Sequence, residues 1–203
     1  GDWSSDVCSS DLWTTKAPGG FGDGEVAAIE QVVAPLSRLA EIYTLGRTAA
    51  NLLNVYVGHD AGERILKGNI RRGDTTTLEA AIWLSDLRGF TSLSESLPPK
   101  DLVDLLNATF GAQVPAIEKH GGEVLKFMGD SLLAIFPASS GAEAACTSAL
   151  AAAEEAYDAC AALETIDTPT RIGVGLHVGK VSYGNIGGET RLDFTCIGPA
   201  VNL

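Results

Sequence analysis

Residues 122–136, GEVLKFMGDSLLAIF, decide the fold that this chain can adopt. They contain two short apolar runs, 123–127 and 132–136, separated by the tetrapeptide MGDS. A Gly-Asp pair between apolar runs is a β-hairpin signal, although it is weaker than Asp-Gly. The stretch therefore predicts two adjacent antiparallel strands, with Asp130 at the tip of their turn.

The sequence before the hairpin predicts a strand followed by a helix. Residues 78–84, LEAAIWL, form a short apolar run between polar turns, as is typical of a buried strand. Over 98–119, apolar residues recur every three or four positions behind two prolines, which predicts a helix that ends before Gly121-Gly122. Pro115 lies inside this segment and should kink or break the helix.

The sequence after the hairpin predicts a helix and two more strands. The helix is expected over the Ala-rich residues 143–163. The strands are expected over 171–178 and 193–197, joined by the Gly-rich stretch 179–188. The resulting order, strand-helix-strand-strand-helix-strand, is that of a ferredoxin-like, palm-type α+β sandwich.

A helical linker is expected ahead of this domain. Apolar residues spaced by three and four over 25–45 predict an amphipathic helix, which Pro35 should kink or split. This helix either covers its own domain or is a signalling or dimerising helix. A second, short helix is expected over 59–67. We therefore set the linker at 25–77 and the domain at 78–203.

The two ends of the sequence suggest a fragment. Residues 1–12, GDWSSDVCSSDL, have no periodicity and resemble a translated sequencing adapter, so we treat 1–24 as a disordered or non-native leader. At the other end, residues 201–203 lie within an apolar pattern and carry no helix stop signal. We expect the domain to be truncated at its C-terminus.

Composition and charge exclude several classes of protein. Of the 203 residues, 45% are hydrophobic, which excludes a disordered or fibrous chain, and no apolar run approaches the ~18 residues of a membrane span. The 26 acidic and 14 basic side chains give a net charge of −12, which disfavours binding to nucleic acid. Four scattered cysteines form no zinc-ligand pattern and predict reduced thiols in a cytoplasmic protein. Such an acidic chain needs a local device such as metal ions to handle phosphates.

A candidate phosphate-binding turn follows the first predicted strand. Asp86 lies at the end of that strand, and Gly89 lets the backbone turn tightly. Taken alone, an Asp before a turn is more often only a cap. In the functional interpretation, successive N–H groups form a nest for phosphate oxygens, namely those of Leu87, Arg88, Gly89, Phe90 and Thr91.

The pair formed by Asp86 and Asp130 is more informative than either residue. By itself, Asp130 is explained as a turn residue. In the predicted strand order, however, the first strand is a neighbour of the hairpin, so the two carboxylates lie at adjacent strand ends. Two carboxylates beside a glycine nest suit one or two Mg²⁺ ions that bridge to a nucleoside triphosphate.

Three blocks of the sequence resemble the signature blocks of class III nucleotidyl cyclases, the catalytic domains of adenylate and guanylate cyclases. They are 82–91 (IWLSDLRGFT), 122–136 and 191–203 (RLDFTCIGPAVNL), in the order that the family has them. The stretch 56–74 also resembles the linker that precedes the catalytic domain in soluble bacterial members. The resemblance covers 78–203 and implies the palm-type fold there.

The resemblance also implies roles for the matching residues. Asp86, Asp130 and the backbone carbonyl of Leu87 would bind two Mg²⁺ or Mn²⁺ ions per site. Asn202 matches the asparagine that orients the ribose and assists the transition state, and the family's transition-state arginine should follow shortly after it. Each active site would form between the two chains of a homodimer, with the metal ligands from one chain and the base-specifying residues from the other.

Lys126 and Thr195 match the two positions that specify the base in this family. Adenine presents an acceptor at N1 and a donor at its 6-amino group, which suit a donor-only ammonium and a hydroxyl that can accept. Guanine reverses both edges, so a lysine would face an N–H donor. Guanylate cyclases of the family have an acidic residue and a Cys here, and because Cys196 is one position from Thr195, a slip in register would weaken the assignment.

These residues lead us to expect an adenylate cyclase that serves signal transduction and converts ATP to 3′,5′-cyclic AMP and pyrophosphate. The ribose 3′-oxygen would attack the α-phosphorus. The alternatives are a catalytically inactive, nucleotide-binding regulatory or dimerisation module, and a guanylate cyclase. Without the family's arginine, the 203-residue chain itself should be weakly active or inactive.

Overall fold

The structure of the chain is a computed structural model that describes residues 14–163 and 170–202. Its contacts divide it into two compact units, residues 1–52 and 53–203. The leader expected over 1–24 lies outside the described residues as far as residue 13, and a loop then runs to the first helix. Within the described ranges, no helix is both long and apolar enough to cross a membrane.

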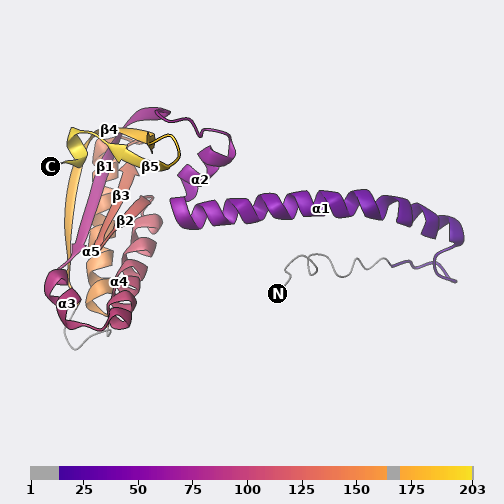
Figure 1. Cartoon of the computed structure of the whole chain (residues 1–203), viewed down its shortest axis with the longest axis horizontal. Coiled ribbons are helices and arrows are strands. Elements are labelled where there is room, and N and C mark those ends of the chain that lie inside the picture. The colour runs from indigo at the N-terminus through magenta and orange to yellow at the C-terminus, as the bar shows by residue number, and fades with distance from the viewer. Residues whose placement is uncertain (1–13, 164–169, 203) are drawn as a thin grey trace. The chain divides into compact units, whose positions relative to one another are not determined.

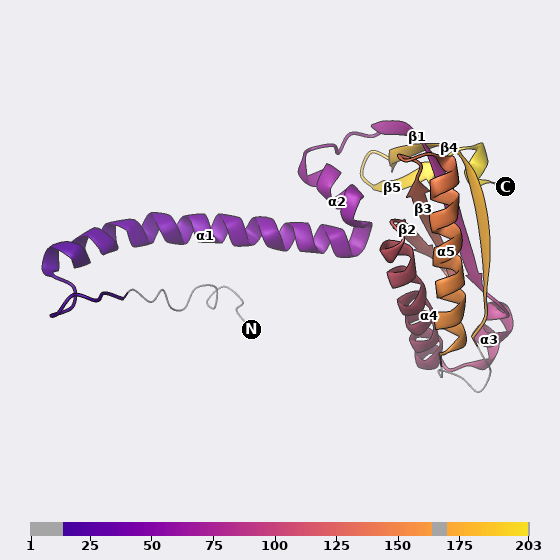
Figure 2. The same cartoon turned by 180° about the vertical axis from the view of Figure 1, so that it is seen from behind.

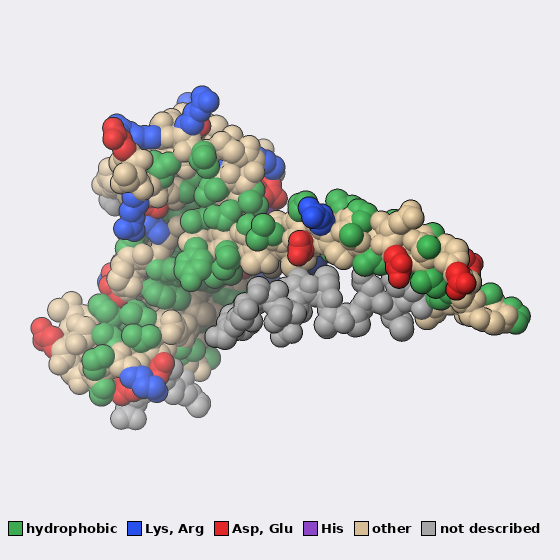
Figure 3. All heavy atoms as spheres, turned by 45° about the vertical axis from the view of Figure 1, so that its right-hand side comes forward, with side chains coloured by type: hydrophobic (Ala, Val, Ile, Leu, Met, Phe, Trp, Pro, Cys, Tyr) green, Lys and Arg blue, Asp and Glu red, His purple; other side chains and the backbone are tan. Residues whose placement is uncertain are grey.

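Helix α1 (Asp23–Val57) runs far beyond the predicted 25–45 and is continuous through Pro35. The expected split at this proline therefore does not occur. A proline inside a helix costs about 3 kcal/mol, and the Ala, Leu and Glu residues on both sides favour the helix strongly enough to sustain it. None of the residues of α1 is buried, and Figure 3 shows apolar side chains among acidic ones along it.

The second unit is built on a five-stranded antiparallel sheet (Figure 1). Its strands, in spatial order, are β2 (Glu123–Met128), β3 (Ser131–Pro137), β1 (Thr75–Leu87), β4 (Ile172–Gly187) and β5 (Leu192–Ile197). Helix α4 (Pro99–Lys119) lies between β1 and β2 in the chain, and α5 (Ala142–Ala161) lies between β3 and β4. The predicted ferredoxin-like order is confirmed, with β5 added beside β4.

Helices α4 and α5 lie side by side across one face of the sheet (Figure 2). The core beneath them contains Trp83 of β1 and Phe136 of β3, whose ring centroids are 6.3 Å apart. Such burial stabilises a fold by roughly 25 cal/mol per Å² of apolar surface. Small side chains let α5 pack closely against the strands: Ala145, Ala149, Ala152, Ala153 and Ala156.

The opposite face of the sheet carries a second apolar cluster. It is covered in part by α2 (His59–Leu66), through Ala61, and by the 3₁₀ helix η1 (Pro199–Val201), through Ala200. The sheet contributes Ala80, Ile82, Leu125, Leu133, Ile135, Val181, Tyr183, Phe194 and Cys196. The predicted short helix over 59–67 is therefore present, and it packs within the second unit.

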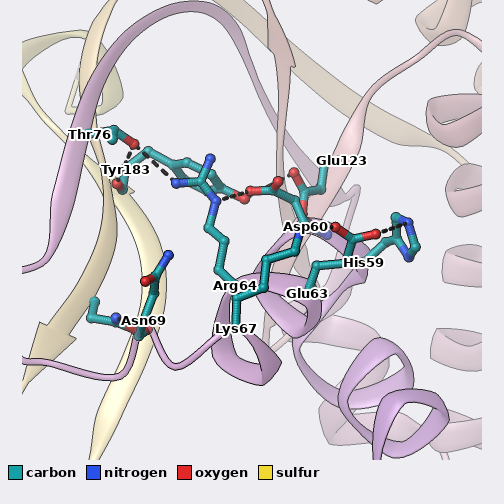
Figure 4. Close-up of polar contacts among 10 residues, drawn as sticks. His59, Asp60, Glu63, Arg64, Lys67, Asn69, Thr76, Glu123 and Tyr183 are labelled. Atoms are coloured by element: carbon teal, nitrogen blue, oxygen red, sulfur yellow. Dashed lines mark hydrogen bonds and ion pairs between the residues drawn. The ribbon is translucent and has the colours of Figure 1, made fainter. Parts of the chain in front are cut away.

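Polar contacts fix α2 on this face (Figure 4). Glu123 of β2 accepts hydrogen bonds from the Asp60 backbone N–H (3.2 Å) and from the Tyr183 hydroxyl (3.0 Å). The Asp60 carboxylate in turn pairs with Arg64 at 2.6 Å, and the Arg64 guanidinium lies 5.2 Å from the centroid of the Tyr183 ring. Two helix residues and two strand residues thus form one connected network.

The Gly-rich stretch 179–188, predicted as a connection, is instead mostly strand, because β4 continues to Gly187 and pairs with both β1 and β5. Its glycines lie between buried residues such as Val181 and Tyr183, which supply the apolar contacts of a strand. Gly184 has a φ of 151°, and a Cβ there would collide with the backbone carbonyl of Asp74. A glycine is required because the two chains approach so closely.

Helix α4 continues through Pro115 to Lys119, so the expected break at Pro115 is also wrong. The proline lies near the C-terminal end of the helix, where only about one further turn depends on it. Ala116 and Ile117, the next two residues, are buried in the core. Their packing holds the last turn in place despite the missing N–H of the proline.

Candidate active site

Asp86 is the penultimate residue of β1 and is exposed to solvent. Its two neighbours, Ser85 and Leu87, are buried on the helix-covered side, where the Ser85 hydroxyl donates to the Gln113 side-chain oxygen of α4 at 2.5 Å. Because side chains alternate along a strand, the Asp86 carboxylate lies on the opposite face of the sheet. The buried contacts of its neighbours therefore fix its direction.

Asp130 lies in the turn between β2 and β3, beside Gly129, whose φ of 66° is in the left-handed region. The Leu87 backbone N–H donates a hydrogen bond to the Asp130 carboxylate at 3.3 Å. The turn of the hairpin therefore meets the end of β1, and the two predicted metal ligands lie at the same end of the sheet. Leu87 connects them, since it follows Asp86 directly.

The turn after β1 engages only part of the predicted nest of N–H groups. Leu87 N–H is bonded to Asp130, and Arg88 N–H donates to the Arg171 carbonyl at 2.8 Å. Gly89 has a φ of 78° and begins α3 (Phe90–Ser96). The first turn of a helix leaves its N–H groups without intrahelical acceptors, so among the residues that the structure describes the predicted donors left without an acceptor are those of Gly89, Phe90 and Thr91.

Gly173 of β4 lies directly opposite Asp86 in the strand pair and was not among the predicted site residues. A Cβ at this position would come within 2.6 Å of the Asp86 Oδ1 and would collide with the Arg88 guanidinium. The Arg88 Nε also lies 3.9 Å from the Asp86 Oδ1. Gly173 therefore provides the space that both side chains occupy, which only knowledge of the β1–β4 register could have revealed.

Lys126 of β2 forms an ion pair with Asp193 of β5, with 2.7 Å between Nζ and Oδ2. These strands lie at opposite edges of the sheet, so the sheet curls far enough to bring its edges into contact. The Lys126 side chain is only 29% exposed. Asp193 was not among the predicted site residues, because a strand pattern does not show which edges of a sheet meet.

Thr195 is buried on β5, and its hydroxyl has no hydrogen-bond partner among the residues that the structure describes. An unsatisfied buried hydroxyl costs about 1–3 kcal/mol. Its neighbour Cys196 packs into the second apolar cluster, paired with Tyr183 of β4, and burial raises the pKa of the Cys196 thiol. The polar side of β5 therefore carries Thr195 and Asp193, whereas Cys196 is a core residue.

Asn202 follows η1 and is exposed. η1 packs against β4 at Gly179, where a Cβ would come within 2.7 Å of the Ala200 Cβ. The structure thus places Asn202 on a segment that is itself held against the sheet.

The two aspartates suit a divalent cation that is completed by other ligands. No group of three or more His, Cys, Asp or Glu residues that could hold a metal ion occurs in the described part of the chain. Mg²⁺ ordinarily binds through one or two carboxylates, waters and substrate phosphates, without a full protein cage. Asp86 and Asp130 beside the free N–H groups of α3 match this mode of binding.

A hollow of about 470 Å³ lies within the second unit, between the α1–α2 junction and β2. Lys126 and Glu123 contribute to its wall, together with Gly58 and Val124. Of the residues the structure describes, neither Asp86 nor Asp130 lines it. In a single chain, the predicted base-specifying lysine and the predicted metal ligands therefore do not share this hollow.

Comparison with known proteins defines the class of this domain. The family model for the adenylate and guanylate cyclase catalytic domain matches residues 74–203, and the chain belongs to this family. The terminal-differentiation-specific adenylate cyclase of Dictyostelium discoideum is 34% identical over 137 residues, which are 66% of this chain and 6% of that protein. The chain therefore spans only a small part of that relative.

Solved structures of both guanylyl and adenylyl cyclases resemble this chain. The guanylyl cyclase Cya2 is 36% identical, with a TM-score of 0.56, and the match covers 63% of this chain and 68% of that one. The adenylyl cyclase CyaB from P. aeruginosa is 32% identical, with a TM-score of 0.59, over 64% of this chain and 70% of that one. Similarity alone therefore leaves the base specificity to be argued from the residues.

Proposed function

We propose that this domain is an adenylate cyclase that converts ATP to 3′,5′-cyclic AMP and pyrophosphate. The observation that carries the proposal is the meeting of Asp86 and Asp130 at one end of the sheet through the Leu87 N–H, beside the free N–H groups that begin α3. This arrangement suits a triphosphate, because anionic oxygens need both cations and N–H donors in a chain of net charge −12.

Asp86, Asp130 and the Leu87 carbonyl would hold two Mg²⁺ or Mn²⁺ ions. When bound, these ions would lower the pKa of the ribose 3′-hydroxyl and neutralise negative charge on the triphosphate. The N–H groups of Gly89, Phe90 and Thr91 would orient the phosphates. Attack of the 3′-oxygen on the α-phosphorus then forms the cyclic ester bond, and the bond to pyrophosphate breaks.

Lys126 and Thr195 would select adenine over guanine. The Lys126 ammonium can only donate, which suits the N1 acceptor of adenine and conflicts with the N1–H of guanine. The Thr195 hydroxyl, which has no hydrogen-bond partner among the described residues, would accept from the 6-amino group. Asn202 would orient the ribose, since it lies on the segment that directly follows β5 and η1.

We further propose that two copies of the chain share each site. The hollow beside Lys126 excludes both aspartates, so one chain alone does not present the two residue sets to a single ligand. Large apolar side chains also remain exposed around these residues, which a second copy would cover: Leu84, Phe127, Met128 and Ile197.

The test is turnover of ATP and GTP by the purified full-length protein and its variants. Asp86→Asn and Asp130→Asn should each lower cyclic AMP formation at least about a hundredfold, because each removes a charge that holds the cations. Asp158→Asn on the exposed side of α5 is the matched control and should be unchanged. Activity of either site variant within a few-fold of the wild type would refute the metal assignment, and a preference for GTP would establish the guanylate cyclase alternative.

A further inference from the structure

The Arg88 side chain lies at the same end of the sheet as the two aspartates. A Cβ at Gly173 would collide with both the Arg88 guanidinium and the Asp86 carboxylate, so these two groups lie together over the glycine. The Arg88 Nε is 3.9 Å from the Asp86 Oδ1. At this distance the opposite charges attract each other without forming a hydrogen bond.

The ion pair is exposed and therefore weak. The Arg88 side chain is 66% exposed and that of Asp86 is 53% exposed, and exposed ion pairs contribute little to stability. In the part of the chain that the structure describes, the guanidinium has no other ion pair and no side-chain hydrogen bond. Its five N–H donors, which form a planar fork, are therefore available to a ligand.

The backbone of Arg88 is fixed although its side chain is not. The Arg88 N–H donates to the Arg171 carbonyl at 2.8 Å, and the preceding Leu87 N–H donates to the Asp130 carboxylate at 3.3 Å. The Arg88 N–H is thus engaged and does not join the predicted nest. Its long side chain, however, starts one residue before Gly89, where the open N–H groups of α3 begin.

We propose that the Arg88 guanidinium is a phosphate-binding arm, which rests on the function proposed above. Without a ligand it pairs with Asp86, and it moves to the triphosphate when nucleotide and cation bind. The guanidinium is repelled by a divalent cation on Asp86 and attracted by phosphate oxygens. Its planar fork can donate to two oxygens of one phosphate at once, which a lysine cannot do in this geometry.

This exchange predicts two effects of opposite sign from one substitution, Arg88→Gln. Without nucleotide, Mn²⁺ should bind about threefold more tightly, because the guanidinium no longer neutralises the Asp86 carboxylate. At saturating Mn²⁺, 3′-deoxy-ATP, which cannot be cyclised, should bind about tenfold more weakly, the size of one hydrogen bond between charged groups. Paramagnetic resonance of the free ion measures the first affinity, and calorimetry measures the second.

Two further variants separate the charge from the shape of the side chain. Arg88→Lys keeps the charge but lacks the fork, so it should bind Mn²⁺ as the wild type does and restore only part of the triphosphate affinity. Arg72→Gln is the matched control, because it removes an exposed arginine from the turn before β1, whereas Asp86 lies at the other end of that strand. It changes the net charge equally and should leave both affinities within twofold of the wild type.

A purely structural role makes a different prediction. Loss of packing over Gly173 would lower the melting temperature of Arg88→Gln and weaken the binding of both probes. That result, an Mn²⁺ affinity that does not rise, or an unchanged triphosphate affinity overturns the proposal for Arg88. If the wild type binds 3′-deoxy-ATP but forms no cyclic AMP from ATP, the proposed catalysis fails while the two affinities still decide the role of Arg88. A wild type that does not bind 3′-deoxy-ATP contradicts both.

Discussion

Gly173 controls the geometry around Asp86 although it has no side chain of its own. It lies opposite Asp86 in the β1–β4 pair, and the Asp86 carboxylate and the Arg88 guanidinium both occupy the space beside its Cα. The position of the carboxylate proposed to bind metal therefore depends on a residue that contributes no ligand. This dependence can be tested because a second glycine, Gly175, lies two residues along the same strand.

Gly173→Ala should displace Asp86 and Arg88, because the new Cβ would come within 2.6 Å of the Asp86 Oδ1. We expect cyclic AMP formation to fall about tenfold or more, with weaker activation by Mg²⁺, and a stability loss of about 1–3 kcal/mol from overpacking. Gly175→Ala is the control, since its Cβ would meet only the Leu84 carbonyl at 3.7 Å, an ordinary contact. Equal effects of the two substitutions on Mg²⁺ activation would contradict the role assigned to Gly173.

At the scale of elements, α2 is joined to the sheet through a carboxyl that is costly to ionise. Burial raises the pKa of Glu123, and the hydrogen bond from Tyr183 only partly opposes this effect. Burial and the nearby Glu123 charge also raise the pKa of Tyr183, so its hydroxyl stays protonated and donates throughout the ordinary pH range. Docking of α2 should therefore depend on pH.

The folded chain binds the Glu123 proton more tightly than the unfolded chain does. The stabilisation is therefore complete below the ordinary pKa of 4.5 and is lost as pH rises through the raised folded value. Relative to Glu123→Gln, the free energy of unfolding of the wild type should thus fall as pH rises from 4.5 through the raised folded pKa of Glu123. Urea unfolding at a series of pH values measures this difference. Glu155→Gln is a control in which the pH dependence should be reversed. Relative to this variant the wild type should become more stable as pH rises, because hydrogen bonds from Lys119 and His120 lower the pKa of Glu155. A difference between wild type and Glu123→Gln that is independent of pH would contradict the burial argument.

At the scale of the whole molecule, local patterns predicted the fold and the places of the two aspartates. The hairpin 122–136 and the strand containing Trp83 have clear apolar runs, and the strand order then places Asp130 beside the end of β1. What could not be predicted depends on register and curvature. Gly173 is opposite Asp86 only through the pairing of β1 with β4, and Asp193 meets Lys126 only because the sheet curls.

Glycine and proline gave the misleading local signals. The stretch 179–188 has so many glycines that it resembles a loop, yet Gly184 and Gly187 are required there because a Cβ would collide with the backbone carbonyls of Asp74 and Arg191. Pro35 and Pro115 are unfavourable inside helices, but the helices that contain them are long enough, or packed well enough, to continue. In each case the surrounding structure outweighs an unfavourable local preference.

The most direct measurement is complementation between two inactive variants. Asp86→Asn removes a metal ligand and Lys126→Met removes the base donor, so neither variant alone should form cyclic AMP. If each site takes these residues from different chains, mixing and reassociating the two variants produces dimers with one intact site, and activity should recover to about a quarter of the wild-type value. Substantial activity in either variant alone, or no recovery in mixtures that are shown to exchange subunits, would contradict a cyclase site shared between two copies of this chain.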